Sequence, residues 1–471
     1  MQFPVEQGNQ LPPNMQKTIT PHNKIAIFGA GLVGSLLAIF LAKKGFKVEI
    51  HEKRPDLRFK SFANLRSINL ALSHRGWHAL EKAGLADALR ELAMPMYGRV
   101  VHSENGEQSF FPYGEKDQAI YAISRYKLNC FLLDEAEKLP GIKIYFESKA
   151  EKFSFDKSLS YVSDIEGLRH RIEADAFIGS DGAFSALRYE MMREDKFFYQ
   201  QAYIEHGYKE FTIHPGPNGG WATRNDGLHI WPRKSFMMIA LPNQDETFTA
   251  TLFYPFEGTS SFETIRTPDE IRRLFEEEFA DLIPLMPDYV QQFQNHPVAS
   301  LVTIRCAPWN NQNFLLIGDA AHAVVPFYGQ GMIAGFEDCR ILMDMLEEHS
   351  TWESLFEDFS QKRRPDAEAI SQLALDNFIE MRDLVSDPAF QLKKKLESLL
   401  IKSGVSDWIP LYTMVTFSDL PYSEARRRGL HQAAILEKIR LAENWNFLPV
   451  EEWKDKLLFH YDKWKDDKNL A

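Results

Sequence analysis

The sequence predicts an α/β fold with three parts: a Rossmann-type nucleotide-binding domain, an inserted antiparallel β-sheet domain and a C-terminal helical region. Three observations lead to this prediction. A glycine-rich turn follows a short β-rich run near residue 24, apolar residues alternate between residues 203 and 256, and apolar residues recur at helical spacing after about Pro365.

The first element is a strand–helix–strand unit. KIAIFG (24–29) is typical of a strand, LVGSLLAIFLAKKG (32–45) of a helix ending at glycine, and FKVEIHEK (46–53) of a second strand. This order predicts a parallel nucleotide-binding sheet at the start of the chain.

The turn within this unit has the pattern GxGxxG. Gly29 permits the tight turn, Gly31 lets the backbone approach a pyrophosphate, and Gly34 lets helix and strand pack closely. Glu52 ends the second strand, where a carboxylate accepts hydrogen bonds from an adenosine ribose. A chance glycine-rich turn is the alternative, but the flanking elements and Glu52 favour a dinucleotide site.

Two later strands also end in Gly and Asp. AFIGSDG (176–182) delivers Asp181, and FLLIGDA (314–320) delivers Asp319, as expected where a buried strand leads into a ligand-binding loop. An ordinary Asp-Gly turn is the competing interpretation for Asp181. Beyond Asp319, Gly331 frees the backbone to approach a flat ring, and a helix is expected to start near Met332 with its amides facing that ring.

The inserted sheet is predicted from LHIWPRKSFMMIALP (228–242) and TFTATLFYPF (247–256), where Phe248, Ala250, Leu252 and Tyr254 share one face. We expect a sheet covered on one side. The predicted boundaries are a flexible tail at 1–23, a nucleotide-binding domain at 24–190 and 300–365, a β-sheet substrate domain at 191–299 to which part of 72–115 contributes, and a helical domain at 366–471.

Composition excludes several classes of protein. A net charge of −12 argues against nucleic acid as a partner. The three cysteines are scattered without zinc spacing, so we predict no metal site and a reduced, cytoplasmic protein. No run of ~18 apolar residues predicts a membrane span. Near the end, Trp453, Leu457, Tyr461 and Trp464 have helical spacing, which favours a helix packed on the protein over one lying on a membrane surface.

Together these motifs resemble the single-component FAD-dependent aromatic hydroxylases. The resemblance implies tightly bound, non-covalent FAD, NADPH as co-substrate, and dioxygen activated as a flavin 4a-hydroperoxide. Longer stretches, including 65–85, 229–243, 325–339, 377–382 and 409–418, resemble the branch of this family that converts L-kynurenine to 3-hydroxy-L-kynurenine. That similarity runs from about Lys24 to about Arg428. Mitochondrial members of the family end in a hydrophobic membrane anchor, whereas the polar C-terminus here predicts none, and a monomer or homodimer is expected.

The resemblance assigns a substrate site. Arg99 would pair with the substrate carboxylate, Tyr113 and Tyr412 would donate hydroxyls to it, and Asn377 and Met381 would complete the polar end. Tyr328 would lie above the flavin ring, at a position where family members vary between Phe and His. By spacing alone, the favoured interpretation would be an ordinary surface ion pair for Arg99 and a core position for Tyr113, and only the resemblance favours the substrate site.

We also interpret Phe236 and Met238 as a dry wall around the reacting ring, with a plain core sheet as the competing interpretation. His322 is interpreted as structural and not as a general base, because no nucleophile motif accompanies it.

The FAD site that the motifs and the resemblance imply is Gly29, Gly31, Val33, Gly34, His51, Glu52, Lys53, Arg54, Ala71, Arg125, Ala150, Asp181, Asp319, Gly331, Met332 and Ile333. Ile333 departs from the family, whose members usually carry Asn there, which puts flavin affinity in question. Two alternative functions stay open: a hydroxylase of another aromatic carboxylic acid on the same scaffold, and a non-catalytic FAD-binding regulator.

Overall fold

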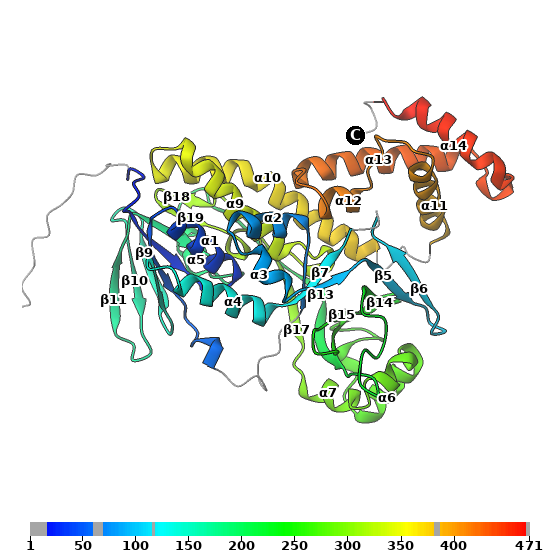
Figure 1. Ribbon diagram of the computed structural model, residues 1–471, viewed down its shortest axis with the longest axis horizontal. Coiled ribbons are helices and arrows are strands. Elements are labelled where there is room, and N and C mark those ends of the chain that lie inside the picture. Colours follow the sequence, from blue (N-terminus) through cyan, green and yellow to red (C-terminus); the bar gives the residue numbers. More distant parts are fainter. Residues whose placement is uncertain (1–16, 60–68, 115–117, 381–386, 468–471) are drawn as a thin grey trace, which may run out of the picture.

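The computed structural model describes residues 17–59, 69–114, 118–380 and 387–467 (Figure 1). Its first sheet has six strands in the order β18 (Asn310–Asn311), β19 (Phe314–Leu316), β12 (Ala176–Gly179), β1 (Lys24–Phe28), β2 (Lys47–His51) and β8 (Ile142–Tyr145). The neighbours from β19 to β8 are parallel, and β18 is antiparallel to β19. The predicted Rossmann-type sheet is therefore confirmed.

Helices cover this sheet, and their apolar residues are buried in a common core with its strands. α1 (Leu32–Lys43) joins β1 to β2 and packs against α4 (Arg125–Glu137) and α9 (Gly331–Met345). α9 also packs against α2 (His74–Lys82), and α3 (Ala86–Arg90) follows α2. The short helices α5 (Ala186–Met191) and α8 (Asp319–His322) follow β12 and β19. The two Asp-bearing loops thus leave adjacent parallel strands, at the sheet edge where such folds bind ligands.

Two small sheets flank this core. One has the order β11 (Arg169–Glu173), β10 (Leu159–Ser163), β9 (Lys149–Ser154). The other has the order β3 (Asn69–Leu72), β7 (Ile120–Ser124), β4 (Met94–Met96).

The inserted sheet has seven strands in the order β17 (Ala299–Ala307), β13 (Phe198–Ile213), β16 (Phe248–Pro255), β15 (Phe236–Pro242), β14 (Gly227–Arg233), β5 (Gly98–His102) and β6 (Gln108–Pro112). It is antiparallel except for the β14–β5 pair, which is parallel. The segment 72–115 contributes β5 and β6. β17, which we placed in the nucleotide-binding part, instead pairs with β13, so the boundary near residue 300 lies several residues too early.

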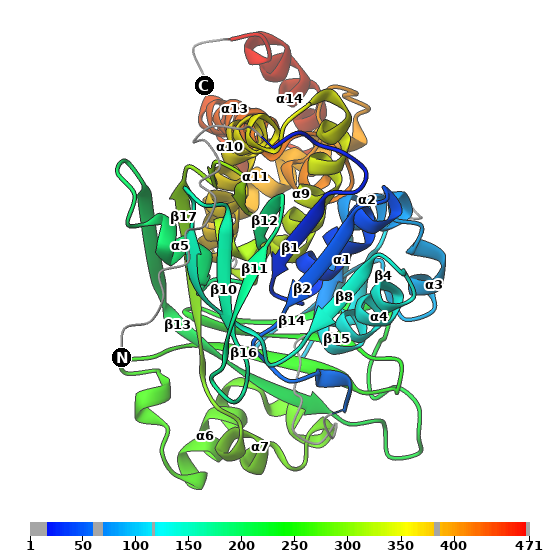
Figure 2. The ribbon, with the colours of Figure 1, turned by 90° about the vertical axis from the view of Figure 1, so that its left-hand side faces the viewer.

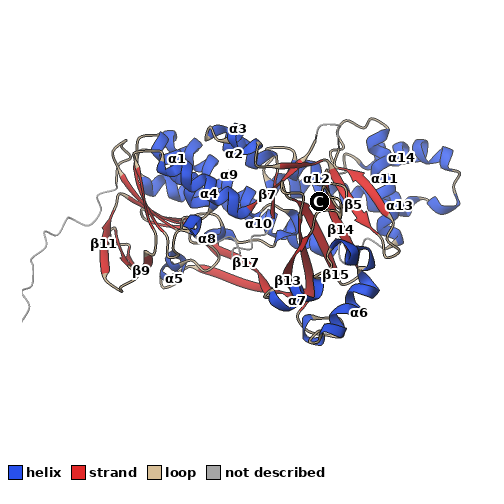
Figure 3. Cartoon of the chain, turned by 60° about the horizontal axis from the view of Figure 1, so that its bottom comes forward, coloured by secondary structure: helices blue, strands red, loops and turns tan. Residues whose placement is uncertain are grey.

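Both faces of this sheet are covered, although the sequence predicted one. Phe248, Ala250, Leu252 and Tyr254 do share a face, and they pack against α6 (Pro268–Glu278) and α7 (Tyr289–Asn295). Figure 3 shows these two helices beside the strands of the inserted sheet. The opposite face carries Phe253, which packs on residues of the nucleotide-binding part and of α10 (Trp352–Ile379). The second face has fewer apolar residues, so the sequence pattern predicts only one covered face.

The C-terminal region is helical, as predicted, with α11 (Pro388–Lys402), α12 (Leu411–Thr416), α13 (Tyr422–Ala442) and α14 (Val450–Trp464). Figure 2 shows α13 and α14 at the opposite end of the molecule from α6 and α7. The expected boundary at Pro365 falls inside α10, because a long helix tolerates one proline without ending. On α14, Leu457 and Tyr461 are buried against α11 and α13, so this helix does pack on the protein.

Among the described residues, no helix combines the length and the apolar character needed to cross a bilayer. The same residues include three free cysteines, two of them buried.

Candidate active site

The glycine-rich turn has the geometry of a dinucleotide cradle. Gly29 has φ +104°, and a side chain there would collide with the backbone of Ser180. A Cβ on Gly34 would lie 2.1 Å from the Gly29 carbonyl oxygen, so only glycine lets α1 start against β1. At Gly31 a Cβ would meet no atom within 4 Å. Open space therefore lies beside the N-terminus of α1, where a pyrophosphate binds in such folds.

Glu52 lies at the end of β2 and is 5% exposed. Its Oε2 accepts a hydrogen bond from the Ala30 amide at 2.9 Å, and its Oε1 accepts from Arg54 Nε at 2.8 Å. Burial raises the pKa of Glu52, but the hydrogen bonds from Arg54 outweigh it and hold the pKa below its usual value. The carboxylate is therefore ionised and fixed next to the glycine turn, as the adenosine-binding role requires.

The loops after β12 and β19 bring two more carboxyl groups to this edge. Asp181 accepts a hydrogen bond from the Ala186 amide at 2.6 Å, and its other oxygen, Oδ1, is buried with no hydrogen-bond partner among the described residues. Burial raises the pKa of Asp181 and of Asp319. The charge of Arg125, at the start of α4, opposes this rise at Asp319 by lowering its pKa.

The remaining predicted cofactor residues lie on several elements, and His51 differs from the others named in this paragraph in having its side chain buried in the core. Val33 packs against Gly318 and Gly335 at the start of α1, Gly331 and Met332 begin α9, and Ala71 lies 3.5 Å from the position of a Cβ on Gly329. Lys53 and Arg54 are exposed beyond β2, and Ala150 lies on β9. His51 is the exception: it is buried, its Nδ1 lies 2.9 Å from Ser148 Oγ, and it stacks on Tyr145, so its side chain belongs to the core.

A second group of residues surrounds Arg99 on β5. The guanidinium carbon lies 4.6 Å from the centre of the Tyr412 ring and 5.8 Å from that of Tyr113. Those two rings stack at 5.3 Å, and Tyr412 stacks on Tyr328 at 5.7 Å. In the part of the chain that the structure describes, no carboxylate lies within ion-pair distance of Arg99, and neither its Nε nor the Tyr113 hydroxyl has a hydrogen-bond partner.

These residues converge from distant parts of the chain. Tyr113, Ala71, Leu228 and Ile239 pack in one apolar cluster, which joins β3 of the nucleotide-binding part to the inserted sheet. Because Ala71 also approaches Gly329, the Arg99 group lies next to the loop that leads into α9. Four of the predicted substrate residues, Arg99, Tyr113, Tyr412 and Tyr328, thus lie together beside the loop that precedes α9.

The other predicted substrate residues, Asn377, Met381 and Phe236, have different outcomes. Asn377 on α10 donates from Nδ2 to the Phe327 carbonyl at 2.7 Å, so it supports the turn that carries Tyr328. Met381 lies outside the described residues. Phe236 packs on Tyr254 and Phe279 beside α6, on the face of the sheet opposite to Arg99, and this contradicts its predicted contact with substrate.

The error at Phe236 has a simple cause. Successive residues of a strand point to opposite faces, and the more strongly apolar set, Phe236 and Met238, fills the core under α6. Met237 and Ile239 face the side of Phe327 and Tyr328 instead. The plain core sheet was thus the correct interpretation for Phe236 and Met238.

Comparisons with known proteins show which family this sequence matches. The family model described as "FAD binding domain" matches residues 22–374. A kynurenine 3-monooxygenase of Christiangramia forsetii is 44% identical over 91% of this chain and 97% of its own length. One from Cytophaga hutchinsonii is 45% identical, over 92% and 98% respectively.

The chain belongs to the kynurenine 3-monooxygenase family. Members of this family are FAD-dependent monooxygenases, so the chain is an FAD-binding enzyme, as the sequence resemblance implied.

Solved structures show the same fold at lower identity. 2-methyl-3-hydroxypyridine-5-carboxylic acid oxygenase superimposes with a TM-score of 0.63 at 20% identity, covering 79% of this chain and 95% of that one. PqsL of Pseudomonas aeruginosa, solved with 2-aminobenzoylacetate, gives 0.63 at 18% identity, covering 77% and 97%.

The residues present fit the FAD of this family. The open side of Gly31, the ionised Glu52 and the unpartnered Oδ1 of Asp181 supply the groups that a dinucleotide needs. The departure at Ile333 lies away from this cradle, because its side chain is fully buried between α9 and α2 and reaches to within 2.7 Å of a Cβ position on Gly76. His322 is buried, binds Asp338 at 2.5 Å and stacks on Trp309, as a structural histidine does.

Two site residues were missed by sequence reasoning. Asn129 on α4 donates to the Ala30 carbonyl at 3.2 Å and so fixes the glycine turn. A polar residue at a buried helical position of 124–139 was the available signal. Gln330, the N-cap of α9, is buried and binds the Tyr422 hydroxyl at 2.8 Å, a contact between distant segments that no local pattern indicates.

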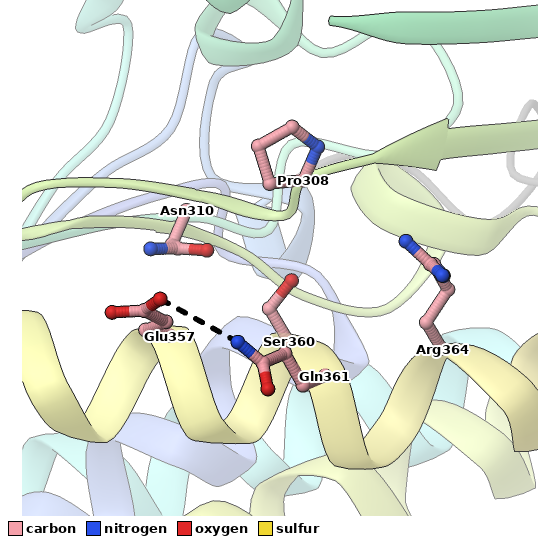
Figure 4. Close-up of a pocket in the computed structure, with 6 residues that line it drawn as sticks. All are labelled: Pro308, Asn310, Glu357, Ser360, Gln361 and Arg364. Carbon is pink, nitrogen blue, oxygen red and sulfur yellow. Dashed lines mark hydrogen bonds between the residues drawn. The ribbon is translucent and has the colours of Figure 1, made fainter. Parts of the chain in front are cut away.

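A separate pocket lies on the outer side of α10 (Figure 4). Its volume is about 580 Å³, and Glu357, Gln361 and Arg364 of α10 face Pro308 and Asn310 across it. None of the predicted site residues lines this pocket, so it forms no part of the candidate active site.

Proposed function

We propose that the chain hydroxylates L-kynurenine to 3-hydroxy-L-kynurenine, using NADPH and dioxygen with bound FAD. The observation that carries this proposal is the Arg99 guanidinium, which lies against two tyrosine rings with no carboxylate of the described residues within ion-pair distance. A cation enclosed in this way is costly unless a ligand supplies the missing anion. The carboxylate of an aromatic amino acid meets that need.

The tyrosines fix the direction of binding. Burial raises the pKa of Tyr113 and of Tyr328, so both phenols stay protonated and can donate hydrogen bonds at physiological pH. With the carboxylate held by Arg99, Tyr113 and Tyr412, the aryl end of the substrate points toward Tyr328 and the loop before α9. The substrate is thereby oriented before any bond changes, which is how positioning accelerates a reaction.

The chain's own residues also keep water away. Tyr328 and Phe327 pack with Phe378 and Met237, and together they close the site on the side of the inserted sheet. When bound, FAD supplies the redox and oxygen-transfer chemistry. The amino group of kynurenine already activates the ring carbon beside it, so no strong protein base is needed.

The names of the relatives favour kynurenine over another aromatic carboxylic acid, since Arg99 and the tyrosines would bind either. The decisive experiment follows NADPH absorbance with purified, FAD-loaded protein and L-kynurenine, and identifies the product by mass. A product heavier by one oxygen atom supports the proposal. If only a different aromatic acid stimulates NADPH oxidation, the protein is a hydroxylase of that acid. If no aromatic acid stimulates NADPH oxidation, a non-catalytic FAD-binding regulator is favoured.

We further propose that the protein works in the cytoplasm as a monomer or homodimer. The free cysteines Cys130, Cys306 and Cys339 support a reducing compartment.

A further inference from the structure

Arg75, on α2, is a fully buried arginine that lies next to the substrate site without touching it. Its Nε donates to the Val415 carbonyl at 3.1 Å, and its Nη2 donates to the carbonyls of Met414 (3.4 Å) and Leu420. These three carbonyls belong to the end of α12 and the segment that follows it. Arg75 therefore holds the helix that carries Tyr412.

α12 needs such support because it is short. The last carbonyls of a helix have no partner within the helix, and a six-residue helix has almost no stability of its own. A guanidinium supplies hydrogen bonds to those carbonyls and a positive charge at the negative end of the helix dipole. The position of Tyr412 over Arg99 thus depends on Arg75.

The other side of the Arg75 guanidinium contacts α9, the helix whose first turn is predicted to bind the flavin. Its Nη1 donates to Glu337 Oε1 at 2.7 Å, and Glu337 lies on α9, whose first turn belongs to the cofactor site. The Arg75 guanidinium also stacks on the Tyr422 ring at 4.1 Å, and the Tyr422 hydroxyl binds Gln330, the N-cap of α9. One side chain therefore joins the helix of Tyr412 to the helix that begins beside the flavin.

Neighbouring charged residues fix the ion pair between Arg75 and Glu337. Glu337 also binds Arg363 at 3.0 Å, and Arg363 binds Asp338 at 3.0 Å, so both carboxylates are neutralised. At the surface of α2, His74 and His78 both contact Asp419, which lies in the same segment after α12. Residues 414–420 are thus bound to α2 at two places, by Arg75 on the buried side of the helix and by His74 and His78 at its surface.

We propose that Arg75 is a positioning residue that holds Tyr412 in its substrate-binding orientation and couples that orientation to α9. The consequence for turnover rests on the proposed function, whereas the consequence for residues 411–420 does not. Lysine cannot replace Arg75, because a single ammonium group cannot span Glu337 and the carbonyls of α12 at once.

The test compares Arg75→Lys with Lys209→Met as a matched control. Lys209 is also a buried cation that binds backbone carbonyls, those of Phe293 and His296, but it lies beside α7. We measure hydrogen exchange of residues 411–420 in FAD-loaded enzyme without substrate, and then KM and kcat for L-kynurenine and NADPH. Should Arg75→Lys fail to fold, Arg75→Gln takes its place with the same expectations, because an amide cannot bond Glu337 and the carbonyls of α12 at once.

In Arg75→Lys, residues 411–420 should exchange at least about tenfold faster, because local opening is no longer opposed by the guanidinium. The KM for kynurenine should rise about tenfold with little change in the KM for NADPH, and the effect should largely disappear in a Tyr412→Phe background, since coupled residues are not additive.

Lys209→Met should change neither the exchange of residues 411–420 nor these KM values. Unchanged exchange in Arg75→Lys, or equal effects of Lys209→Met, overturns the inference. If the native enzyme ignores kynurenine, the proposed function fails, and the exchange data alone decide the role of Arg75.

Discussion

Tyr113 and Tyr412 stack with their ring centres 5.3 Å apart, although one lies just after a strand of the inserted sheet and the other lies in the C-terminal helical region. Their shared neighbour is the Arg99 guanidinium. The carboxylate site therefore exists only when the first and last thirds of the chain are folded together.

Replacing either tyrosine by Phe removes a hydroxyl donor and leaves the stack. A hydrogen bond to a charged group contributes about 1.5–3 kcal/mol, so the KM for kynurenine should rise by about 10- to 100-fold with kcat less affected. Steady-state kinetics of Tyr113→Phe and Tyr412→Phe measure this. Tyr203, which is 54% exposed on the inserted sheet, provides the control Tyr203→Phe, whose kinetics should match the native enzyme.

Arg99 should be more sensitive than either tyrosine. Arg99→Ala removes the cation that contacts both rings, and Arg99→Lys keeps a charge but loses the two-pronged geometry that matches a carboxylate. We expect KM for kynurenine to rise by at least about 100-fold in Arg99→Ala and by an intermediate factor in Arg99→Lys. FAD content should stay native in both. Native kinetics in Arg99→Ala would remove this residue from the substrate site.

The sequence predicted the elements whose pattern is local. Gly29, Gly34 and Glu52 lie within one strand–helix–strand unit, and their spacing alone indicates the cradle that the structure shows. The position of Arg99 beside Tyr412 could not be obtained that way, because it depends on packing between α12 and the inserted sheet. Only the family resemblance brought these residues together in advance.

Periodicity also has a limit within a single strand. The alternation in 236–242 correctly predicted a strand, yet it could not show which face meets the substrate. The prediction placed the more apolar residues, Phe236 and Met238, beside the substrate, whereas they belong to the core under α6. The less uniform set, with Met237 and Ile239, faces the site.

Two glycines of the cradle should respond in opposite ways to the same substitution. Gly34→Ala places a Cβ 2.1 Å from the Gly29 carbonyl oxygen, so the turn must open, and we expect little soluble protein. Gly31→Ala meets no protein atom within 4 Å, so the fold should persist while FAD binds at least about tenfold more weakly. Soluble yield, far-UV circular dichroism and FAD titration of the apoprotein distinguish the two. Equal behaviour of the variants would contradict this account.

Stability should decrease below neutral pH because two histidines are buried in the neutral form. Burial lowers the pKa of His51 and of His229 from 6.5 to about 4. Between these values the unfolded chain binds protons that the folded chain does not, so the free energy of unfolding falls as pH falls from 6.5 toward 4. At pH 5 the loss amounts to about 2 kcal/mol per histidine.

The thermal midpoint of native protein, measured at pH 7 and pH 5, tests this expectation against His51→Asn. That variant should lose less stability between the two pH values, even if it is less stable at both. His22 is exposed, so His22→Asn serves as the control and should follow the native protein. The assignment of His51 is wrong if all three proteins lose the same stability.

Restoring the residue usual for the family at position 333 should harm the protein. Ile333 is fully buried between α9 and α2, where it packs against Gly76 and Leu72 and not toward the cofactor cradle. Ile333→Asn would bury an amide there without partners, at a cost of about 1–3 kcal/mol in addition to the lost apolar contact. The thermal midpoint should therefore fall, while the Kd for FAD should stay within about threefold of native because the substitution leaves the backbone amides at the start of α9 unchanged. Ile401→Asn, at a residue 45% exposed on α11, should leave the midpoint nearly unchanged. A variant with Asn at 333 that binds FAD tenfold more tightly would show that this side chain reaches the flavin after all.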